Sequence, residues 1–278
     1  NKIKMVEADL CDLSGLLRHV KMIRPDIIFH LAAQSYVLTS FNTPVQTIWT
    51  NVIGTVNLLE AVRLSEINPV IHICSSSEVY GQVSEDEVPI TESCPFRPAS
   101  PYAVSKVGED MVAFQYWVSY KIKTIRTRMF THTGPRRGDV FAMSFFGKQI
   151  AAAELGLKEP IIHVGNLKSI RTFCDVRDAV KAYWLLVNKC KPGEVYNIGG
   201  DATLTIGEAL EKMLSFSRKK CEVKVDPNLL RPSDVTLQIP STEKFSKETG
   251  WKPEIPLEKT LRDILDYWRD ELSRCPWK

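Results

Sequence analysis

The sequence lacks several features that would identify whole classes of protein. No apolar run approaches the roughly 18 residues of a transmembrane helix, and the start carries no signal peptide. The five histidines are scattered and the cysteines form no Cys-x-x-Cys pair, so no metal-ligand cluster is indicated. The net charge of +3 is small and spread along the chain. We therefore expect no membrane, nucleic-acid or metal partner.

The cysteines themselves indicate a compartment. There are seven, an odd number at irregular spacing, and Cys74 falls within an apolar run. This pattern is typical of reduced thiols in a cytosolic protein and not of a disulfide framework. We therefore expect a cytoplasmic location.

A glycine-rich phosphate loop is also missing. Neither Gly-x-Gly-x-x-Gly nor Gly-x-x-Gly-x-x-Gly occurs among the 14 glycines, although strands and helices alternate as they do in dinucleotide-binding folds. By comparison with such folds, the strands predicted at residues 4–13 and 26–34 correspond to the third and fourth of a complete sheet. We therefore expect that an N-terminal segment of about 50 to 60 residues, with two strands and the loop, is absent from this chain. Its absence would also remove the residue that separates NAD from NADP.

Apolar periodicity predicts the remaining elements. Helices are predicted at residues 14–23, 51–62, 143–155, 206–217 and 257–272, and strands at residues 70–74, 124–130, 161–164, 195–198 and 221–225. The pattern indicates an α/β fold: a Rossmann-like doubly wound parallel sheet without its N-terminal strands, with a smaller C-terminal α/β substrate lobe. Residues 1–130 would form the dinucleotide-binding domain, lacking its first strands and glycine loop. Residues 131–278 would form mainly the substrate lobe, with some segments returning to the first domain.

Two segments carry side chains suited to chemistry. Residues 75–81, Ser-Ser-Ser-Glu-Val-Tyr-Gly, follow the strand at residues 70–74, so their polar groups would emerge at the carboxyl end of a strand, where open α/β sheets bind ligands. In residues 100–106, Ser-Pro-Tyr-Ala-Val-Ser-Lys, the tyrosine and lysine are four apart and share one face of a helix. An ammonium beside a phenol favours phenolate, so we expect Lys106 to lower the pKa of Tyr102 toward the operating pH.

Together these segments resemble the extended short-chain dehydrogenase/reductases that act on nucleotide sugars. Residues 128–138, Arg-Met-Phe-Thr-His-Thr-Gly-Pro-Arg-Arg-Gly, are similar to a loop of the GDP-mannose 4,6-dehydratases. The resemblance implies a redox-neutral 4,6-dehydration of a nucleotide-activated hexose, GDP-mannose to GDP-4-keto-6-deoxymannose. The catalytic residues that it implies are Ser76, Glu78, Tyr102 and Lys106. Glu78 would remove the C5 proton once C4 is oxidised, although a structural carboxylate that caps a turn remains an alternative.

The resemblance also implies a cofactor and a substrate. The cofactor would be NADP, with NAD as an alternative, and its contacts would be Asp9, Leu10, Leu31, Ala32, Ala33, Gln34, Ser35, Tyr102, Lys106, His132 and Arg137. The substrate would be a nucleotide-diphosphate sugar, and its contacts would be Ser77, Thr131, Arg171, Arg231 and Asp234. Guanidinium groups suit a diphosphate because they bind it through two hydrogen bonds. From the residues alone, residues 31–35 could equally form an ordinary tight turn, and isolated arginines usually lie on the surface.

Three departures from the family pattern leave alternatives open. Ser76 replaces the usual Thr, Thr131 the usual Asn and Asp234 the usual Glu, and the last two bear on sugar and base specificity. The close alternative is a GDP-4-keto-6-deoxymannose reductase that uses NAD(P)H and forms GDP-rhamnose. A non-catalytic binding subunit is a third, if the chain naturally lacks its glycine loop. The resemblance further implies a homodimer or homotetramer, paired through helices such as residues 107–120, for which core packing is the alternative.

Overall fold

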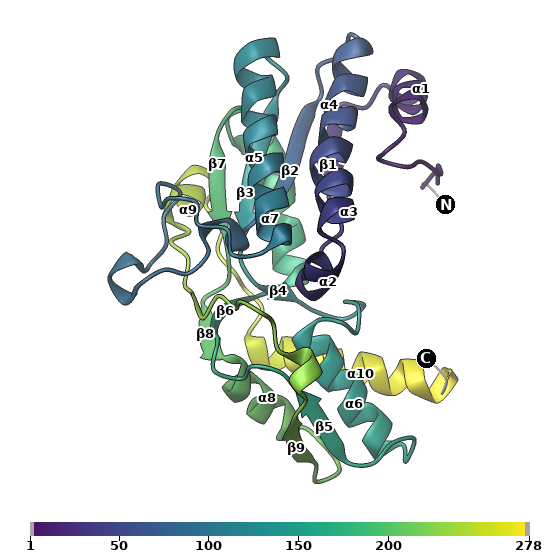
Figure 1. Cartoon of the computed structure of the whole chain (residues 1–278), viewed down its shortest axis with the longest axis vertical. Helices are drawn as coiled ribbons and strands as arrows, with labels where there is room; N and C mark the ends of the chain where they lie inside the picture. Colours follow the sequence, from purple (N-terminus) through teal and green to yellow (C-terminus); the bar gives the residue numbers. More distant parts are fainter. Residues whose placement is uncertain (1–2, 276–278) are drawn as a thin grey trace. The chain divides into compact units, whose positions relative to one another are not determined.

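The computed structural model describes residues 3–275, which form two compact α/β units (Figure 1). The first unit runs to Gly81 and takes in Pro95–Arg128 and Tyr183–Tyr196; the second comprises Gln82–Cys94, Met129–Ala182 and the chain from Asn197 on. The chain therefore passes between the units several times. The roles predicted for residues 1–130 and 131–278 stay predictions.

A four-stranded sheet forms the centre of the first unit. Its strands are β1 (Ile27–His30), β2 (Val70–Ser76), β3 (Thr124–Met129) and β7 (Val195–Ile198), hydrogen-bonded in the order β1–β2–β3–β7. Strand β1 runs parallel to β2, with Ile27 opposite Val70. Both β2 and β3 are almost wholly buried, as expected of parallel strands covered on both faces. The predicted α/β class with a parallel sheet is confirmed.

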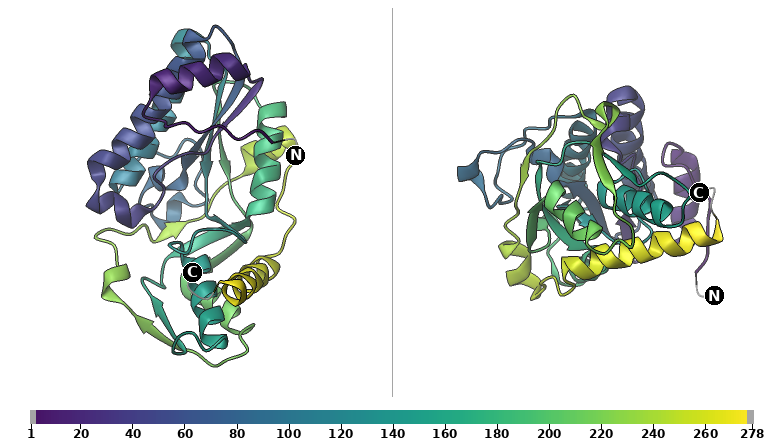
Figure 2. Two further views of the ribbon diagram at one scale, coloured as in Figure 1. Left: turned by 90° about the vertical axis from the view of Figure 1, so that its right-hand side faces the viewer. Right: turned by 90° about the horizontal axis from the view of Figure 1, so that it is seen from below.

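Helices cover both faces of this sheet (Figure 2). Helices α1 (Leu13–Ile23), α4 (Gly54–Leu64) and α5 (Pro101–Tyr120) share one face, where a core cluster joins Leu16, Leu59, Ile71 and Ala113. Helix α7 (Val176–Lys189) lies on the other face, and its Tyr183 ring packs on the His72 ring with centroids 4.4 Å apart. The helix expected at residues 51–62 is present as the π-helix η1 (Trp49–Ile53) followed by α4; the sequence does not predict the short helices before it, α2 (Val37–Asn42) and α3 (Pro44–Ile48).

One predicted strand does not form. Residues 3–9 are irregular, although the sequence predicts a strand at residues 4–13. A strand needs a neighbour that satisfies its backbone N–H and C=O groups, and no strand within residues 3–275 pairs with this segment. The prediction was wrong because apolar character alone does not supply that neighbour.

The second unit consists of small sheets and three main helices. Strand β6 (Ile170–Asp175) lies between β10 (Leu237–Gln238) and β4 (His132–Thr133) and pairs antiparallel with β8 (Ala202–Thr205). Strands β5 (Ile161–Val164) and β9 (Glu222–Val225) form a parallel pair. Helices α6 (Ala142–Glu154), α8 (Ile206–Leu214) and α10 (Leu257–Arg274) share one core cluster with β5 and β6. Further elements are the 3-10 helices η2 (Ser77–Tyr80), η3 (Glu85–Glu87) and η4 (Pro227–Leu229), and the helix α9 (Glu243–Thr249).

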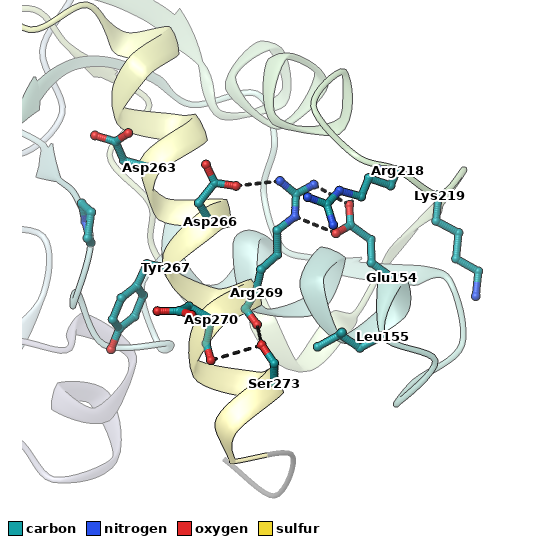
Figure 3. A pocket seen from close by; sticks show the side chains of 11 residues that line it. Glu154, Leu155, Arg218, Lys219, Asp263, Asp266, Tyr267, Arg269, Asp270 and Ser273 are labelled. Carbon is teal, nitrogen blue, oxygen red and sulfur yellow. Dashed lines mark hydrogen bonds and ion pairs between the residues drawn. The ribbon is translucent and has the colours of Figure 1, made fainter.

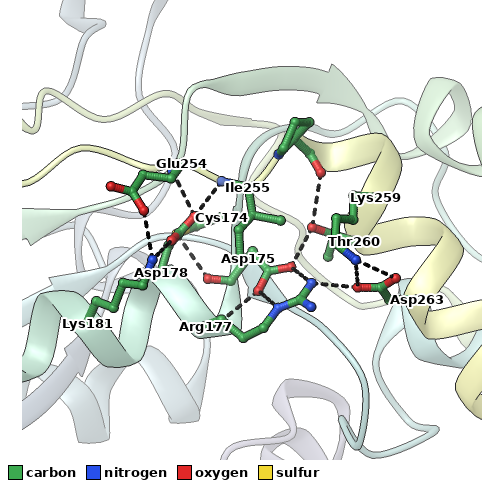
Figure 4. Close-up of polar contacts among 11 residues, drawn as sticks. Cys174, Asp175, Arg177, Asp178, Lys181, Glu254, Ile255, Lys259, Thr260 and Asp263 are labelled. Atoms are coloured by element: carbon green, nitrogen blue, oxygen red, sulfur yellow. Dashed lines mark hydrogen bonds and ion pairs between the residues drawn. The ribbon is translucent and has the colours of Figure 1, made fainter.

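Two aspartates near the start of α7 hold the C-terminal part of the second unit (Figure 4). The buried Asp178 carboxylate accepts hydrogen bonds from the backbone N–H groups of Glu254, at 2.9 Å, and Ile255, at 2.8 Å. The buried Asp175 carboxylate accepts a hydrogen bond of 2.6 Å from the Thr260 hydroxyl. These contacts connect α7 with the entry into α10.

Within the part of the chain that the structure describes, no helix is both long and apolar enough to cross a membrane. The same residues contain no group of three or more His, Cys, Asp or Glu side chains placed to hold a metal ion. All seven cysteines are free thiols.

Asp178 generates a stability prediction. Asp178→Ala would leave two backbone N–H groups without their acceptor, so we expect the free energy of unfolding to fall by about 2 to 4 kcal/mol in urea titrations. Glu254→Ala is the matched control, because the Glu254 side chain is 65% exposed and, within residues 3–275, forms a surface ion pair of 2.8 Å with Lys181. That control should change the free energy by less than about 0.5 kcal/mol. Equal losses in the two variants would contradict the role of Asp178.

Two buried histidines lie on neighbouring strands of the sheet, His30 on the face covered by α4 and His72 on the face covered by α7. His30 Nε2 is 2.9 Å from Thr55 Oγ1, and His72 Nε2 is 2.8 Å from Thr127 Oγ1. Burial lowers the pKa of His30 to about 4 and that of His72 to about 3, and the positive charge of Lys106 adds to both shifts. Both imidazoles are therefore neutral in the folded protein at neutral pH.

This neutrality predicts an acid-sensitive fold. In the unfolded chain both histidines protonate near pH 6.5, so below that pH the unfolded state binds more protons and the free energy of unfolding falls. Between about pH 6.5 and 4 each histidine should add a slope approaching about 1.4 kcal/mol per pH unit. Urea titrations at several pH values measure that slope, and His72→Gln should reduce it by nearly one proton. An unchanged slope would show that His72 is not buried in its neutral form.

Candidate active site

The structure places Tyr102 and Lys106 in the first two turns of α5. Helix α5 begins cleanly because the Ser100 hydroxyl accepts a hydrogen bond of 3.1 Å from the Ala103 N–H and Pro101 occupies the first turn. Both predicted side chains are buried, and Lys106 Nζ lies 5.8 Å from the centre of the Tyr102 ring. The predicted pairing of phenol and ammonium on one helix face is therefore present.

The serines and the carboxylate follow directly from β2. Ser76 caps η2, and its hydroxyl accepts a hydrogen bond of 3.2 Å from the Glu78 N–H and also bonds to the Tyr102 side chain. Ser77 is buried, whereas Glu78 is partly exposed. The turn must end in glycine, because a Cβ on Gly81 would stand 1.7 Å from a backbone oxygen. The motif thus holds the Ser76 hydroxyl against Tyr102 and fixes the backbone of Glu78 next to that hydroxyl.

The pKa of Tyr102 differs from the prediction. Burial raises it above the ordinary value of a phenol, and Lys106 and the Ser76 hydrogen bond offset only part of that effect. The positive charge of the ammonium is itself partly compensated, since Lys106 Nζ donates to Glu109 Oε2 at 2.9 Å and to the Cys74 carbonyl at 3.0 Å. The expectation of a lowered pKa was therefore wrong: Lys106 acts in the expected direction, but burial and Glu109 oppose it.

A buried asparagine connects this cluster to the turn after β1. Asn51, within the π-helix η1, donates from Nδ2 to Ser105 Oγ at 2.8 Å and to the Gln34 carbonyl at 3.0 Å. Its Oδ1 accepts from the Gln34 N–H at 2.7 Å. Sequence analysis did not single out Asn51, and an irregular helical turn of this kind often marks a functional site.

The predicted cofactor turn is open at its apolar end. Leu31, 56% exposed, and Ala32 stand at the carboxyl end of β1, Ala33 is partly buried, and Ser35 is exposed. The Gln34 side chain is engaged internally and donates to Thr47 Oγ1 at 3.0 Å. An exposed leucine and alanine at the end of a parallel strand fit the flat, apolar rings of a dinucleotide.

Asp9 and Leu10 lie just before α1. Asp9 is exposed, and its Oδ1 accepts a hydrogen bond of 2.8 Å from the Cys11 N–H. The Leu10 carbonyl accepts one of 2.9 Å from Asn57 of α4. In the described part of the chain, neither residue hydrogen-bonds to a predicted catalytic side chain.

The predicted loop of the second unit contains the short strand β4. The Thr131 carbonyl accepts a hydrogen bond of 2.9 Å from the Cys174 N–H of β6, which fixes the loop. Burial and the nearby Arg137 lower the pKa of His132 to about 4, so its imidazole is neutral. The Arg137 guanidinium stacks on the Phe141 ring at 3.9 Å from the centroid.

The two predicted diphosphate arginines converge on one carboxylate of the second unit. Arg171 Nη2 lies 3.8 Å and Arg231 Nη1 3.6 Å from Asp234 Oδ1. The other oxygen, Asp234 Oδ2, accepts hydrogen bonds from Asn166 at 2.7 Å and Ser169 at 3.1 Å. The structure thus brings Arg171 next to Arg231 and Asp234, which lie far from it in the sequence.

These arginines differ in how freely they could meet a ligand. Arg171 is buried and donates to the Val235 carbonyl at 2.6 Å, whereas the Arg231 side chain is 31% exposed. Sequence analysis treated the two as equivalent. Arg231 is therefore the more available cation of the pair.

A separate hollow of about 950 Å³ lies in the second unit beside α10 and the end of α6 (Figure 3). Its charged side chains pair with one another, as Arg269 does with Glu154 and Asp266, each at 2.7 Å. As far as residues 3–275 show its lining, no predicted site residue belongs to it. This hollow is therefore not our candidate for the active site.

Comparison with known proteins agrees with the geometry. The family profile for GDP-mannose 4,6 dehydratase matches residues 1–264. A GDP-6-deoxy-D-mannose reductase of Pseudomonas aeruginosa is 34% identical over 248 residues, which cover 89% of this chain and 82% of the relative. A GDP-mannose 4,6-dehydratase of Yersinia enterocolitica is 32% identical over 288 residues, covering 92% of this chain and 76% of the relative.

A solved structure shows the same arrangement of the chain. The structure of RMD from Pseudomonas aeruginosa complexed with NADPH superposes with a TM-score of 0.89 at 32% sequence identity, covering 96% of this chain and 88% of that one. The Rossmann-like fold is thus confirmed, as is the resemblance on which the site was predicted. The chain belongs to the GDP-mannose 4,6-dehydratase family.

Proposed function

We propose that this protein catalyses the redox-neutral 4,6-dehydration of a nucleotide-activated hexose, converting GDP-mannose to GDP-4-keto-6-deoxymannose. The observation that carries the proposal is Glu78, a partly exposed residue whose backbone N–H bonds to the Ser76 hydroxyl, which in turn bonds to the buried Tyr102. Dehydration needs a base at C5 of the sugar. A simple dehydrogenase or 4-epimerase does not.

The proposed cofactor is NADP, with NAD as the alternative. NADPH is bound in the related Pseudomonas structure, and the exposed apolar end of residues 31–35 suits a dinucleotide ring. Tyr102 and Lys106 would hold the nicotinamide end, and Arg137 would suit a 2′-phosphate. When bound, the nicotinamide supplies an acceptor and donor of hydride.

The side chains divide the proton transfers among them. Tyr102 takes the proton of the 4-hydroxyl, while the Ser76 hydroxyl orients that oxygen. Oxidation at C4 acidifies C5, whose proton Glu78 removes. Ser77 would orient the 6-hydroxyl, which leaves as water with the proton that Glu78 has taken from C5. C6 would then receive the hydride removed from C4, and C5 a proton, so that the reaction is redox-neutral overall. Each step uses a group at the carboxyl end of β2 or in the first turns of α5.

The second unit supplies the proposed substrate contacts. Arg171 and Arg231 would bind the diphosphate, and Thr131 the sugar. Asp234 now lies within 4 Å of both guanidinium groups, so the diphosphate competes with this carboxylate for them. Because Arg231 is the more exposed, we expect it to move onto the ligand.

A reductase is the second candidate, since the Pseudomonas relative at 34% identity carries that name. The protein would then use NADPH to reduce a 4-keto-6-deoxy sugar, and Glu78 would serve only within the η2 turn.

We also propose a cytoplasmic homodimer or homotetramer. The exposed apolar side chains of α5 support pairing between copies, namely Val104, Met111, Phe114 and Val118.

The reaction can be tested directly. We expect the purified protein with NADP, and no added reductant, to convert GDP-mannose to a product lighter by one water, which mass spectrometry detects. Consumption of NADPH with the 4-keto-6-deoxy sugar, while GDP-mannose stays intact, would instead establish the reductase. Inactivity in both assays would favour a non-catalytic binding subunit.

Substitutions then assign the roles. We expect Tyr102→Phe, Lys106→Met and Glu78→Gln each to lower kcat by about 10²- to 10⁴-fold, because each removes a proton-transfer group or its support. Tyr116→Phe is the control: it deletes another hydroxyl of α5, bonded to Glu60 at 2.7 Å, and should leave kcat within about twofold. Full dehydration by Glu78→Gln would rule out Glu78 as the C5 base.

A further inference from the structure

We propose that Glu109 is a positioning residue of the active site, whose carboxyl group holds the Lys106 ammonium and governs how strongly that cation acts on the Tyr102 phenol. The kinetic part of this inference rests on the proposed function. The effect on Tyr102 itself can be measured without any substrate.

Geometry places the three groups in one row. Tyr102, Lys106 and Glu109 are spaced i, i+4 and i+7 along α5 and therefore share one face of the helix. Lys106 Nζ donates to Glu109 Oε2 at 2.9 Å, and the two side chains are only 6% and 1% exposed. A charge pair so removed from water interacts far more strongly than one on the surface.

The negative charge of Glu109 has fewer cationic partners than that of the adjacent Asp110. Asp110 binds two guanidinium groups, Arg126 Nη1 at 2.8 Å and Arg128 Nε at 2.9 Å. Glu109 has only Lys106, and its Oε1 is buried without a hydrogen-bond partner among residues 3–275. A half-satisfied buried carboxylate is costly to keep ionised, so protonation relieves it.

The surrounding charges point the same way. Burial raises the pKa of Glu109 to about 7, an effect that Lys106 reduces and Asp110 increases. Lys106 itself stays protonated, because Glu109, Tyr102 and Cys74 raise its pKa against the effect of burial. Among the described residues, further titratable or charged groups near this cluster are His30 on β1, His72 and Cys74 on β2, and Arg126 and Arg128 of β3, which the neighbouring Asp110 binds.

Ionisation of Glu109 therefore changes the field at the phenol. When Glu109 is ionised, its negative charge offsets Lys106 and helps to raise the pKa of Tyr102. When Glu109 is protonated, the charge of Lys106 acts on Tyr102 without an opposing negative charge on Glu109. The pKa of Tyr102 is thus lower when Glu109 is protonated than when Glu109 is ionised.

Glu109→Gln tests the inference, since it keeps the size and an oxygen acceptor for Lys106 but removes the charge. The titration of Tyr102 is read from tyrosinate absorbance, as the difference between each protein and the same protein carrying Tyr102→Phe, because the chain has eight tyrosines. We expect Glu109→Gln to lower the Tyr102 midpoint by about one pH unit. Glu60→Gln, which removes the carboxylate bonded to Tyr116 of the same helix, should leave that midpoint unchanged.

Kinetics provide the second reading. With GDP-mannose, the pH profile of kcat for Glu109→Gln should shift to lower pH by the same amount, while KM changes less than about threefold. A midpoint and profile equal to those of the unaltered protein would overturn the proposal and leave Glu109 a purely structural residue. A shifted midpoint without turnover of GDP-mannose in any variant would support the inference and refute the proposed function. Should the glutamine variant not fold, Glu109→Ala removes the same charge and must give the same shift.

Discussion

A single buried carboxylate, Asp110, holds the catalytic elements of the first unit in register. It binds Arg126 and Arg128 of β3 at 2.8 and 2.9 Å from the middle of α5. Arg128 also donates to the Tyr80 hydroxyl at 3.0 Å, at the end of η2. The helix with Tyr102 and Lys106, the central strand and the turn with Glu78 thus share one charge network. Breaking such a network leaves a buried charge uncompensated, which is far more costly than its formation is favourable.

Burial has two opposing effects on the phenol of this site. The phenol and ammonium must be shielded from bulk water if the cation is to act strongly on the phenol. The same shielding penalises the phenolate form and raises the pKa of Tyr102. Two carboxylates follow one another on α5, one neutralised by two arginines and one by a single lysine. Because the charge of Asp110 is compensated by two cations and that of Glu109 by one, the site stays close to neutral overall while Glu109 can still take up a proton.

Much of this could be predicted from the sequence, but not the connections between segments. Apolar periodicity located β5 and β7 to the residue, since such patterns reflect local burial, and the spacing of Tyr102 and Lys106 predicted their shared helix face. Periodicity failed at residues 4–13, where a strand depends on a neighbour. It also missed Asn51, Glu109 and Asp110, whose roles depend on distant partners. The sign of the Tyr102 pKa shift was missed for the same reason: burial is a property of the packed fold and not of two residues.

The repeated passage of the chain between its two units constrains how such a protein can evolve. Residues 82–94 belong to the second unit and residues 183–196 to the first, so neither unit is a continuous stretch of the chain. No single crossover between genes can exchange one unit for another and leave the other intact. A change in this chain that keeps both units must therefore act within them, by substitution, insertion or deletion, and not by exchange of a whole unit.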